Sequence, residues 1–511
     1  MDMITGSGEM SRVTETKFDV ATVSEAGGEY TMPDYYPEVR RIVSYTAQAL
    51  PDTKFLSGDT LEFGGALAFT VVYIGEDGSL VSLPYATEYS GKLQLPCDVR
   101  GTNEVCIDAS AEDIQCRVLA PRKISIRGRV RQRVYSDQPT EYRMTCCDGE
   151  GAALGLSDRA SVQMLRGKVP VMLCGRGSAT GNAEGEIRDK PGAKPVSCTG
   201  AVNVLEVRAR RDAVTVRGEV AVRCLVFTAD GMYAQAKGTL PFEETVSAQG
   251  CNEGDPCRAW GRVASVTVSE NGEGGLKIEG EYDMEAEWIR QGEVTLVEDA
   301  YSTSWASRAE KSDVFSISPV CCFNSPLTLS GSGKRTTKPA NGEYLTDMSC
   351  EASVASVEIN DGKAVFTGKC IIKAYIASDG EVICQEISLP LKYECQAMTV
   401  SDGGKSVLRS QVSVADVSGR LEGDTVFASC ELCLSICCMQ QTKLSPVTKV
   451  VLDKKAPVAR EGAQIKVFYP DHKETVWDVA KRYLSDADMI ESVNGVRRKD
   501  ECSAPILIPQ W

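Results

Sequence analysis

The feature that most constrains the fold of this chain is a hairpin pattern that occurs three times, at residues 64–85, 217–244 and 367–394. Each copy opens with glycine, continues as an apolar or alternating run, reaches an Asp-Gly pair, and ends in a second run that contains Leu-Pro. Alternation with period two predicts β-strands, and Asp-Gly between two strands is typical of a type I′ hairpin turn. The main prediction is therefore an internal repeat of small antiparallel β units.

Further strand patterns flank each hairpin, so that each repeat is larger than the hairpin itself. The three Asp-Gly pairs are Asp77-Gly78, Asp230-Gly231 and Asp379-Gly380. Alternating runs precede the second and third hairpins, and others follow all three. Two segments rich in small and polar residues, 175–186 and 329–338, are expected to be surface loops, because such clusters usually interrupt strands.

Length, charge and composition limit the classes of function. At about 150 residues per domain, 511 residues predict three or four domains. The net charge of −15 opposes binding to nucleic acids and to anionic membrane surfaces. The longest apolar stretch, residues 66–74, is far shorter than the roughly 20 residues that span a bilayer. The first 20 residues show no export signal, so we expect a protein made in the cytoplasm.

The composition changes after residue 457, where the repeats end. Residues 465–468 have the pattern of a strand, and Thr475 is a suitable N-cap for a helix whose apolar residues share one face. A second short helix follows, and residues 505–509 form a closing strand. We expect this strand to pair with residues 465–468, which gives a βααβ unit of about 45 residues, a size within the usual range for helix–strand units.

This C-terminal region resembles a LysM domain. The family pattern is matched by residues 474–483, Asn494 and residues 506–509. The resemblance implies a βααβ fold and, in some members of the family, binding of glycans. Here Lys473-Glu474 replaces the Gly-Asp of the loop that lines the glycan groove in sugar-binding members, so glycan binding is not favoured.

The three repeats resemble the SPOCS domains of spore coat proteins, on the evidence of the apolar-Tyr-x-x-x-Asp-Gly hairpins and the run Pro241-Phe-Glu-Glu. SPOCS repeats followed by a LysM domain resemble the SipL-like family of spore coat morphogenetic proteins. The expected architecture is mainly β: three tandem antiparallel, β-sandwich-like SPOCS modules and a small C-terminal βααβ LysM domain. The expected boundaries are 33–140, 160–305 and 314–455 for the modules and 463–510 for the LysM domain.

The candidate partner-binding residues lie in the LysM-like unit. Trp477 either anchors a protein partner, as large aromatic residues often do, or fills the core of a unit with few large side chains. Ile465 and Phe468 on the opening strand, with Met489 and Ile490 on the second helix, are candidates to complete an apolar patch around it. Not all five can be exposed in so small a fold.

No residue is predicted to be catalytic or to bind a metal or cofactor. The chain has 21 cysteines, but the run Cys430-Glu-Leu-Cys433-Leu-Ser-Ile-Cys437-Cys438 lies in a strand pattern, where positions three apart point to opposite faces. The only histidine, His472, is expected in a loop. Adjacent cysteine pairs leave later cross-linking open, with the thiols reduced when the chain is made.

The resemblance implies a non-enzymatic adaptor in endospore coat assembly. In that family the LysM domain docks to the polymerising coat ATPase, and we expect the β modules to contact other coat proteins or a second copy of the chain. The implied location is the mother-cell cytoplasm, with recruitment to the forespore surface and spore coat. The alternative is a protein that binds N-acetylglucosamine chains of peptidoglycan through its LysM domain.

Overall fold

The computed structural model describes residues 10–95, 105–188, 190–271, 274–335, 339, 342–378, 381–398, 404–459, 464–470 and 473–510. Strands dominate this part of the chain, with only short helices, which confirms the mainly β prediction. The third Asp-Gly pair, residues 379–380, and His472 lie outside the described residues. None of the helices in the described ranges has the length and apolarity needed to cross a membrane.

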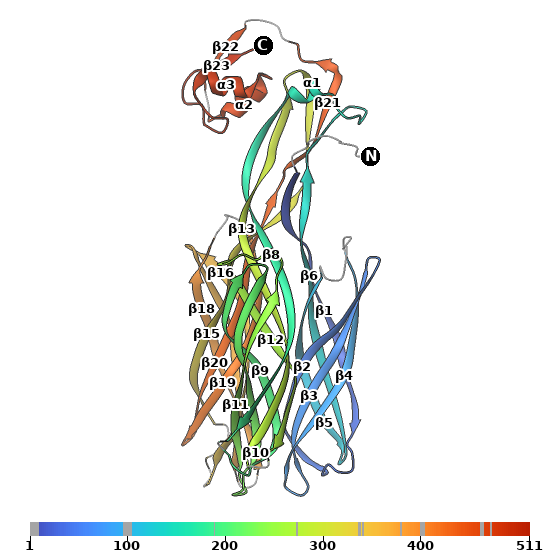
Figure 1. Cartoon of the computed structure of the whole chain (residues 1–511), viewed down its shortest axis with the longest axis vertical. Helices are drawn as coiled ribbons and strands as arrows, with labels where there is room; N and C mark the ends of the chain where they lie inside the picture. The colour runs from blue at the N-terminus through green and yellow to red at the C-terminus, as the bar shows by residue number, and fades with distance from the viewer. Residues whose placement is uncertain are drawn as a thin grey trace.

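One plan of six strands is built three times along the chain (Figure 1). Module 1 comprises β1 (Met10–Thr31), β2 (Val39–Ser57), β3 (Thr60–Gly75), β4 (Leu80–Gln94), β5 (Cys106–Ala120) and β6 (Lys123–Arg143). Module 2 comprises β8 (Val162–Ile187), β9 (Lys194–Arg210), β10 (Ala213–Phe227), β11 (Tyr233–Ser247), β12 (Cys257–Glu270) and β13 (Leu276–Ser302). Module 3 comprises β15 (Val314–Lys334), β16 (Tyr344–Asn360), β17 (Lys363–Ser378), β18 (Glu381–Gln396), β19 (Lys405–Glu422) and β20 (Thr425–Leu444).

Each module is a sandwich of two antiparallel sheets. The second, third and fourth strands form one sheet, in the orders β2-β3-β4, β9-β10-β11 and β16-β17-β18. The fifth and sixth strands pair with the first in the other sheet, in the orders β5-β6-β1, β12-β13-β8 and β19-β20-β15. Contact between β1 and β15 joins the second sheets of modules 1 and 3 into one six-stranded sheet.

The predicted start of module 1 at residue 33 is too late. Strand β1 pairs with β6 from Met10↔Arg143 to Thr31↔Lys123, so the module begins at Met10. The error arose because β1 is rich in polar residues and precedes the first recognisable hairpin, so its own sequence does not mark it as part of a repeat.

The first two hairpins form at their Asp-Gly pairs, but not through the predicted type I′ turn. Gly78 and Gly231 have φ of 81° and 77°, whereas the preceding aspartates have negative φ. The backbone N–H of Gly78 donates to the carbonyl of Gly75, and the N–H of Gly75 donates to the carbonyl of Ser79. This is a three-residue loop in which a type I turn is followed by a left-handed glycine, an alternative that Asp-Gly serves equally well.

The two segments expected to be loops are parts of strands. Residues 175–186 belong to β8, and β15 continues to Lys334. Glycines of β8 are needed for close packing against β11 of the facing sheet, since a Cβ on Gly177 would lie 1.8 Å from the carbonyl oxygen of Ser247, and one on Gly181 would lie 2.5 Å from Oε1 of Glu244. Small residues therefore allow the two sheets to approach one another rather than interrupting a strand.

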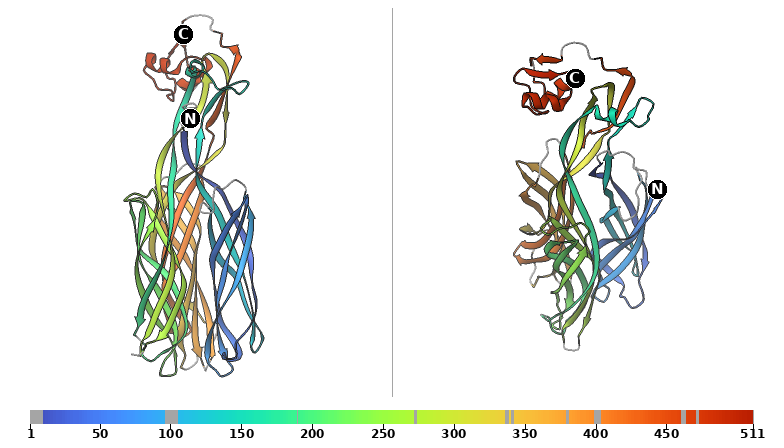
Figure 2. Two further views of the ribbon diagram at one scale, coloured as in Figure 1. Left: turned by 45° about the vertical axis from the view of Figure 1, so that its right-hand side comes forward. Right: turned by 45° about the horizontal axis from the view of Figure 1, so that its top comes forward.

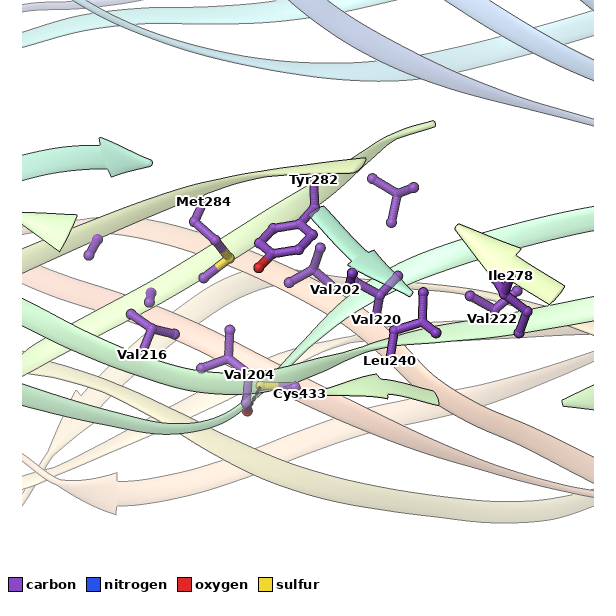
Figure 3. Packing of buried hydrophobic residues seen from close by; sticks show 14 of the residues in the cluster. Val202, Val204, Val216, Val220, Val222, Leu240, Ile278, Tyr282, Met284 and Cys433 are labelled. Atoms are coloured by element: carbon purple, nitrogen blue, oxygen red, sulfur yellow. Dashed lines mark hydrogen bonds between the residues drawn. The ribbon is translucent and has the colours of Figure 1, made fainter. Parts of the chain in front are cut away.

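The core of each module lies between its two sheets. In module 2, Val202, Val220, Leu240, Tyr282 and Met284 come from both sheets and fill the space between them (Figure 3). Full burial of an aliphatic or aromatic side chain of this size contributes about 1.5–3 kcal/mol, so these contacts provide the main driving force for folding of each sandwich.

A buried polar cluster joins the three modules. Arg258 and Glu287 of module 2 form an ion pair in which Nε donates to Oε2 at 2.9 Å, and Arg258 also donates to the carbonyl of Arg409 in module 3. Arg409 pairs with Asp137 of module 1 and lies 3.8 Å from the ring centroid of Tyr135. Arg258, Glu287 and Arg409 are at most 4% exposed. We call this cluster the junction.

A narrow extension, here called the stalk, leads away from the modules. It consists of residues 162–168 of β8, residues 295–302 of β13 and the sheet β14-β21-β7, formed by Trp305–Lys311, Val447–Pro457 and Thr145–Asp148. The short helix α1 (Leu156–Ala160) precedes β8. Figures 1 and 2 show that the stalk runs along the long axis and carries the C-terminal unit at its end.

The predicted C-terminal βααβ arrangement is present. It consists of β22 (Ile465–Phe468), α2 (Val476–Arg482), α3 (Ala487–Asn494) and β23 (Ile506–Pro509). The strands β22 and β23 are antiparallel, with Ile465 opposite Pro509 and Phe468 opposite Ile506, as the sequence indicated.

Candidate functional site

Local capping interactions fix the two helices of the C-terminal unit. The side chain of Thr475 accepts from the backbone N–H of Asp478, and the Asp478 carboxylate accepts from the backbone N–H of Thr475 at 3.0 Å. Asp486 caps α3 in a similar way, and α3 ends at Gly495 with a φ of 68°. These signals are visible in the sequence, which explains why the helices could be predicted.

The interior of the unit is small and apolar. Phe468 of β22 is partly buried and packs against this interior. The fully buried residues come from both helices and from β23, and they are Val476, Val479, Ala480, Ala487, Ile490, Ile506 and Ile508. Asn494 connects α3 to β23, because its amide donates to the carbonyl of Leu507 and its oxygen accepts from the Leu507 N–H, each at 2.8 Å. The unit therefore has a core of its own beside the contacts it makes with the stalk.

Trp477 lies where the C-terminal unit meets the stalk and is 2% exposed. Its ring meets that of Tyr301 edge to face, with centroids 5.0 Å apart. The indole Nε1 donates to Oδ2 of Asp299 at 2.9 Å, and Lys481 Nζ donates to the same oxygen at 2.6 Å. Trp477 is thus an anchor, but in this structure the surface that it contacts belongs to its own chain.

The charge on Asp299 is stabilised by these donors. Burial alone would raise the pKa of its carboxyl, but the hydrogen bonds from Lys481 and Trp477 outweigh burial, and the pKa lies below its ordinary value. Asp299 is therefore ionised at neutral pH, where an unpaired carboxylate in the same place would be costly.

Further polar contacts surround the Trp477 contact. The Tyr301 hydroxyl donates to the carbonyl of Ser485 at 2.6 Å, Arg498 Nη1 donates to the carbonyl of Met164 at 2.9 Å, and Lys499 pairs with Glu298 at 2.6 Å. We call the whole set of contacts between the C-terminal unit and the stalk the seam. A cleft of about 850 Å³ runs along it, lined partly by Thr475, Asp478 and Arg498.

The structure separates the five residues predicted for partner binding. Trp477 faces the stalk and Ile490 faces the core, so neither is accessible in this arrangement. Phe468 and Met489 are half-buried, and Phe468 contacts the Tyr483 ring with centroids 6.2 Å apart. Ile465 is 51% exposed. The single patch of five residues is therefore not formed, because a unit of this size needs some of them for its interior.

An exposed apolar surface that the sequence analysis missed adjoins Ile465. Val467 is 49% exposed and lies opposite Leu507 in the β22–β23 pair, and Leu507 is 39% exposed. Alternation along a strand places Ile465, Val467 and Leu507 on one face of this small sheet. We call these three residues the apolar strip. The alternation in Ile465-Lys-Val467-Phe could have indicated this strip, because it places Phe468 on the opposite face from Ile465 and Val467.

The cysteine run in β20 points in two directions, as expected for a strand. Cys430 lies in the core of module 3, whereas Cys433 lies against module 2, and its thiol donates to the carbonyl of Val204 at 3.2 Å. The four cysteines of the run therefore do not converge on one point.

Part of module 2 matches the model of a known protein family. Residues 194–271 match the family model described as "SipL, SPOCS domain", which covers β9 to β12. The match supports a SipL-like, sporulation-related protein. A comparison with curated proteins gives no match.

Proposed function

We propose that this chain is a non-enzymatic structural adaptor in endospore coat assembly. The match of residues 194–271 to the SipL SPOCS domain carries this proposal. The strand order of module 2 recurs in modules 1 and 3, which supports the view that all three modules are of the SPOCS type. We also propose that the three modules act as one rigid body and do not move independently, and the burial of the junction supports this.

The C-terminal unit, in this proposal, is a LysM-type domain that docks to the polymerising coat ATPase on the forespore surface. The apolar strip is the contact surface, because Ile465, Val467 and Leu507 are exposed while Trp477 is occupied by the seam. Exposed apolar side chains that share one face are the usual core of a protein interface. The seam sets the direction in which this surface points.

The three modules bind other coat proteins, or a second copy of the chain, through their outer surfaces. Several modest contacts on one rigid body raise the effective concentration of each partner near the others. The chain is accordingly made in the mother-cell cytoplasm and recruited to the forespore surface and the coat.

The test is binding of the full-length chain to the purified polymerising ATPase. Ile465→Glu places a charge on the apolar strip without disturbing a core, and we expect it to weaken binding at least tenfold, since charge at an interface centre is costly. Leu205→Glu is the matched control, because Leu205 is a 66% exposed apolar residue of module 2 far along the sequence. Equal affinity of both variants and the wild type would refute docking through the strip.

Peptidoglycan binding is the alternative, and the cleft along the seam is the observation that favours it. Glycan sites are concave and carry polar groups that fix the ligand, and Thr475 and Asp478 line this cleft. Sedimentation of the same proteins with purified peptidoglycan distinguishes the two functions. Co-sedimentation that is unaffected by Ile465→Glu, without ATPase binding, would replace the adaptor proposal by the alternative.

A further inference from the structure

Three thiols converge in the core of module 3. They belong to Cys350 on β16, Cys370 on β17 and Cys430 on β20, so they come from both sheets of the sandwich. The Sγ of Cys370 lies 3.3 Å from that of Cys350 and 3.4 Å from that of Cys430, and all three sulfurs lie within 4.8 Å of one another. No local pattern in the sequence indicates this group, because its members are far apart in the chain.

The other two modules show that packing alone does not require sulfur here. In each module a glycine lies beside a register shift in the sheet, and the residue two positions later is fully buried. These pairs are Gly65 and Leu67, Gly218 and Val220, and Gly368 and Cys370. The equivalent position is therefore aliphatic in modules 1 and 2 and a thiol only in module 3.

The residue that faces this position also differs between the modules. A Cβ added to Gly128 would lie 3.0 Å from Leu67, and one added to Gly280 would lie 3.9 Å from Val220. Modules 1 and 2 thus place glycine against an aliphatic side chain, where module 3 places Cys430 against Cys370. Module 3 therefore has two cysteine side chains at the positions where modules 1 and 2 have a glycine and an aliphatic side chain.

We propose that Cys350, Cys370 and Cys430 form a three-coordinate site for a soft monovalent metal ion, Cu(I). Thiolates favour soft ions, and a metal–thiolate bond of about 2.3 Å in a trigonal arrangement needs sulfurs about 4 Å apart. The separations of 3.3 and 3.4 Å from Cys370 are about 0.6–0.7 Å shorter than this, a difference that rotation of the side chains can supply. The bound ion would connect the β16-β17 sheet to β20.

Charge favours a monovalent ion. The three thiols lie among apolar side chains in the core of module 3, where a net charge is costly. Binding of Cu(I) releases one proton from one of the three thiols to solvent and forms one Cu–thiolate bond, while the other two thiols bind as neutral sulfur ligands, so that the loaded site carries no net charge. Zinc, in contrast, normally needs four ligands, and the group within reach in the described residues contains three cysteines only.

The experiment is anaerobic titration of the reduced, full-length chain with Cu(I) in competition with a coloured Cu(I) chelator. Cys370→Val introduces the residue that module 2 has at this position, so that the fold is retained, as circular dichroism can verify. The matched control is Cys384→Ser, an exposed cysteine of the same module. Cys350→Ala serves as the second variant if Cys370→Val does not fold.

The wild type and Cys384→Ser are expected to retain one Cu(I) per chain more than Cys370→Val. Cu(I) is also expected to raise the melting temperature of the first two proteins and to leave that of Cys370→Val unchanged, because only an ion between the sheets cross-links them. Equal retention of Cu(I) by the wild type and Cys370→Val, or no thermal difference between them, would overturn the proposal.

Discussion

The junction and the seam both hold parts of the chain together, but their charged side chains are buried to different degrees. Both connect separately folded parts of the chain through aromatic rings and ion pairs. At the junction the side chains of Arg409 and Asp137, which join modules 3 and 1, are 1% and 8% exposed, whereas at the seam the side chains of Lys481 and Asp299 are 44% and 20% exposed. Buried charges whose partner is removed are far costlier than half-exposed ones, so the junction is permanent and the seam can open.

Removal of a charge from the junction should have the largest effect. Glu287→Ala leaves Arg258 and Arg176 without the carboxylate to which both donate. We expect a loss of about 3–5 kcal/mol in the free energy of unfolding, the usual cost of a buried charge left unpaired. Chemical denaturation, followed by circular dichroism, measures this loss in the free energy of unfolding. A loss below about 1 kcal/mol, the size typical of exposed pairs, would show that the junction does not differ from the seam.

Removal of the anchor from the seam should have an effect that stays local and leaves the stability of the three modules unchanged. Trp477→Ala removes the contact with Tyr301 and a hydrogen bond to Asp299, at a cost of about 3–5 kcal/mol that falls on the C-terminal unit and its docking. Hydrogen exchange should accelerate in residues 473–510 and remain unchanged in the cores of the modules. Faster exchange throughout all three modules would contradict the separation of the two regions.

Acid should weaken the seam before the junction. Three guanidinium groups, those of Arg176, Arg258 and Arg409, outweigh burial and lower the pKa of Glu287 to about 2. The pKa of Asp299 is also lowered, but by a single half-exposed ammonium group, that of Lys481, together with the indole of Trp477. Both pKa values are depressed, so each carboxylate stabilises the protein fully above its unfolded pKa and loses its contribution as pH falls through its folded pKa.

The seam should therefore open while Glu287 is still ionised. Tryptophan fluorescence between pH 5 and pH 2 would follow this opening, and Asp299→Asn is the control, because it should abolish the early transition. An early transition of equal size in Asp299→Asn would assign it to another group.

Much of the fold could be predicted from the sequence, for identifiable reasons. Asp-Gly pairs and alternation marked the hairpins, and Thr475 marked the start of α2, because turns and caps depend on local residue types. The strands at residues 175–186 could not be recognised, because their glycines are selected by the close approach of another sheet, a contact that is distant in the sequence.

The site was predicted less completely. Trp477 was singled out from the sequence as a candidate anchor or core residue, but its contact, Asp299, lies 178 residues away and leaves no local trace. The same holds for the junction, where Arg409 and Asp137 come from different modules. Long-range ion pairs of this kind require the three-dimensional structure.

The most direct test of the account is zero-length cross-linking of the full-length chain with a carbodiimide, which joins amines to carboxylates in contact. Lys481–Asp299 and Lys499–Glu298 span the seam, each at 2.6 Å, while Lys168–Glu293, between β8 and β13 at 3.1 Å, serves as an internal control. The account predicts all three links by mass spectrometry and the loss of the two seam links in Trp477→Ala. Formation of the control link alone in the wild type would show that the C-terminal unit is not docked on the stalk.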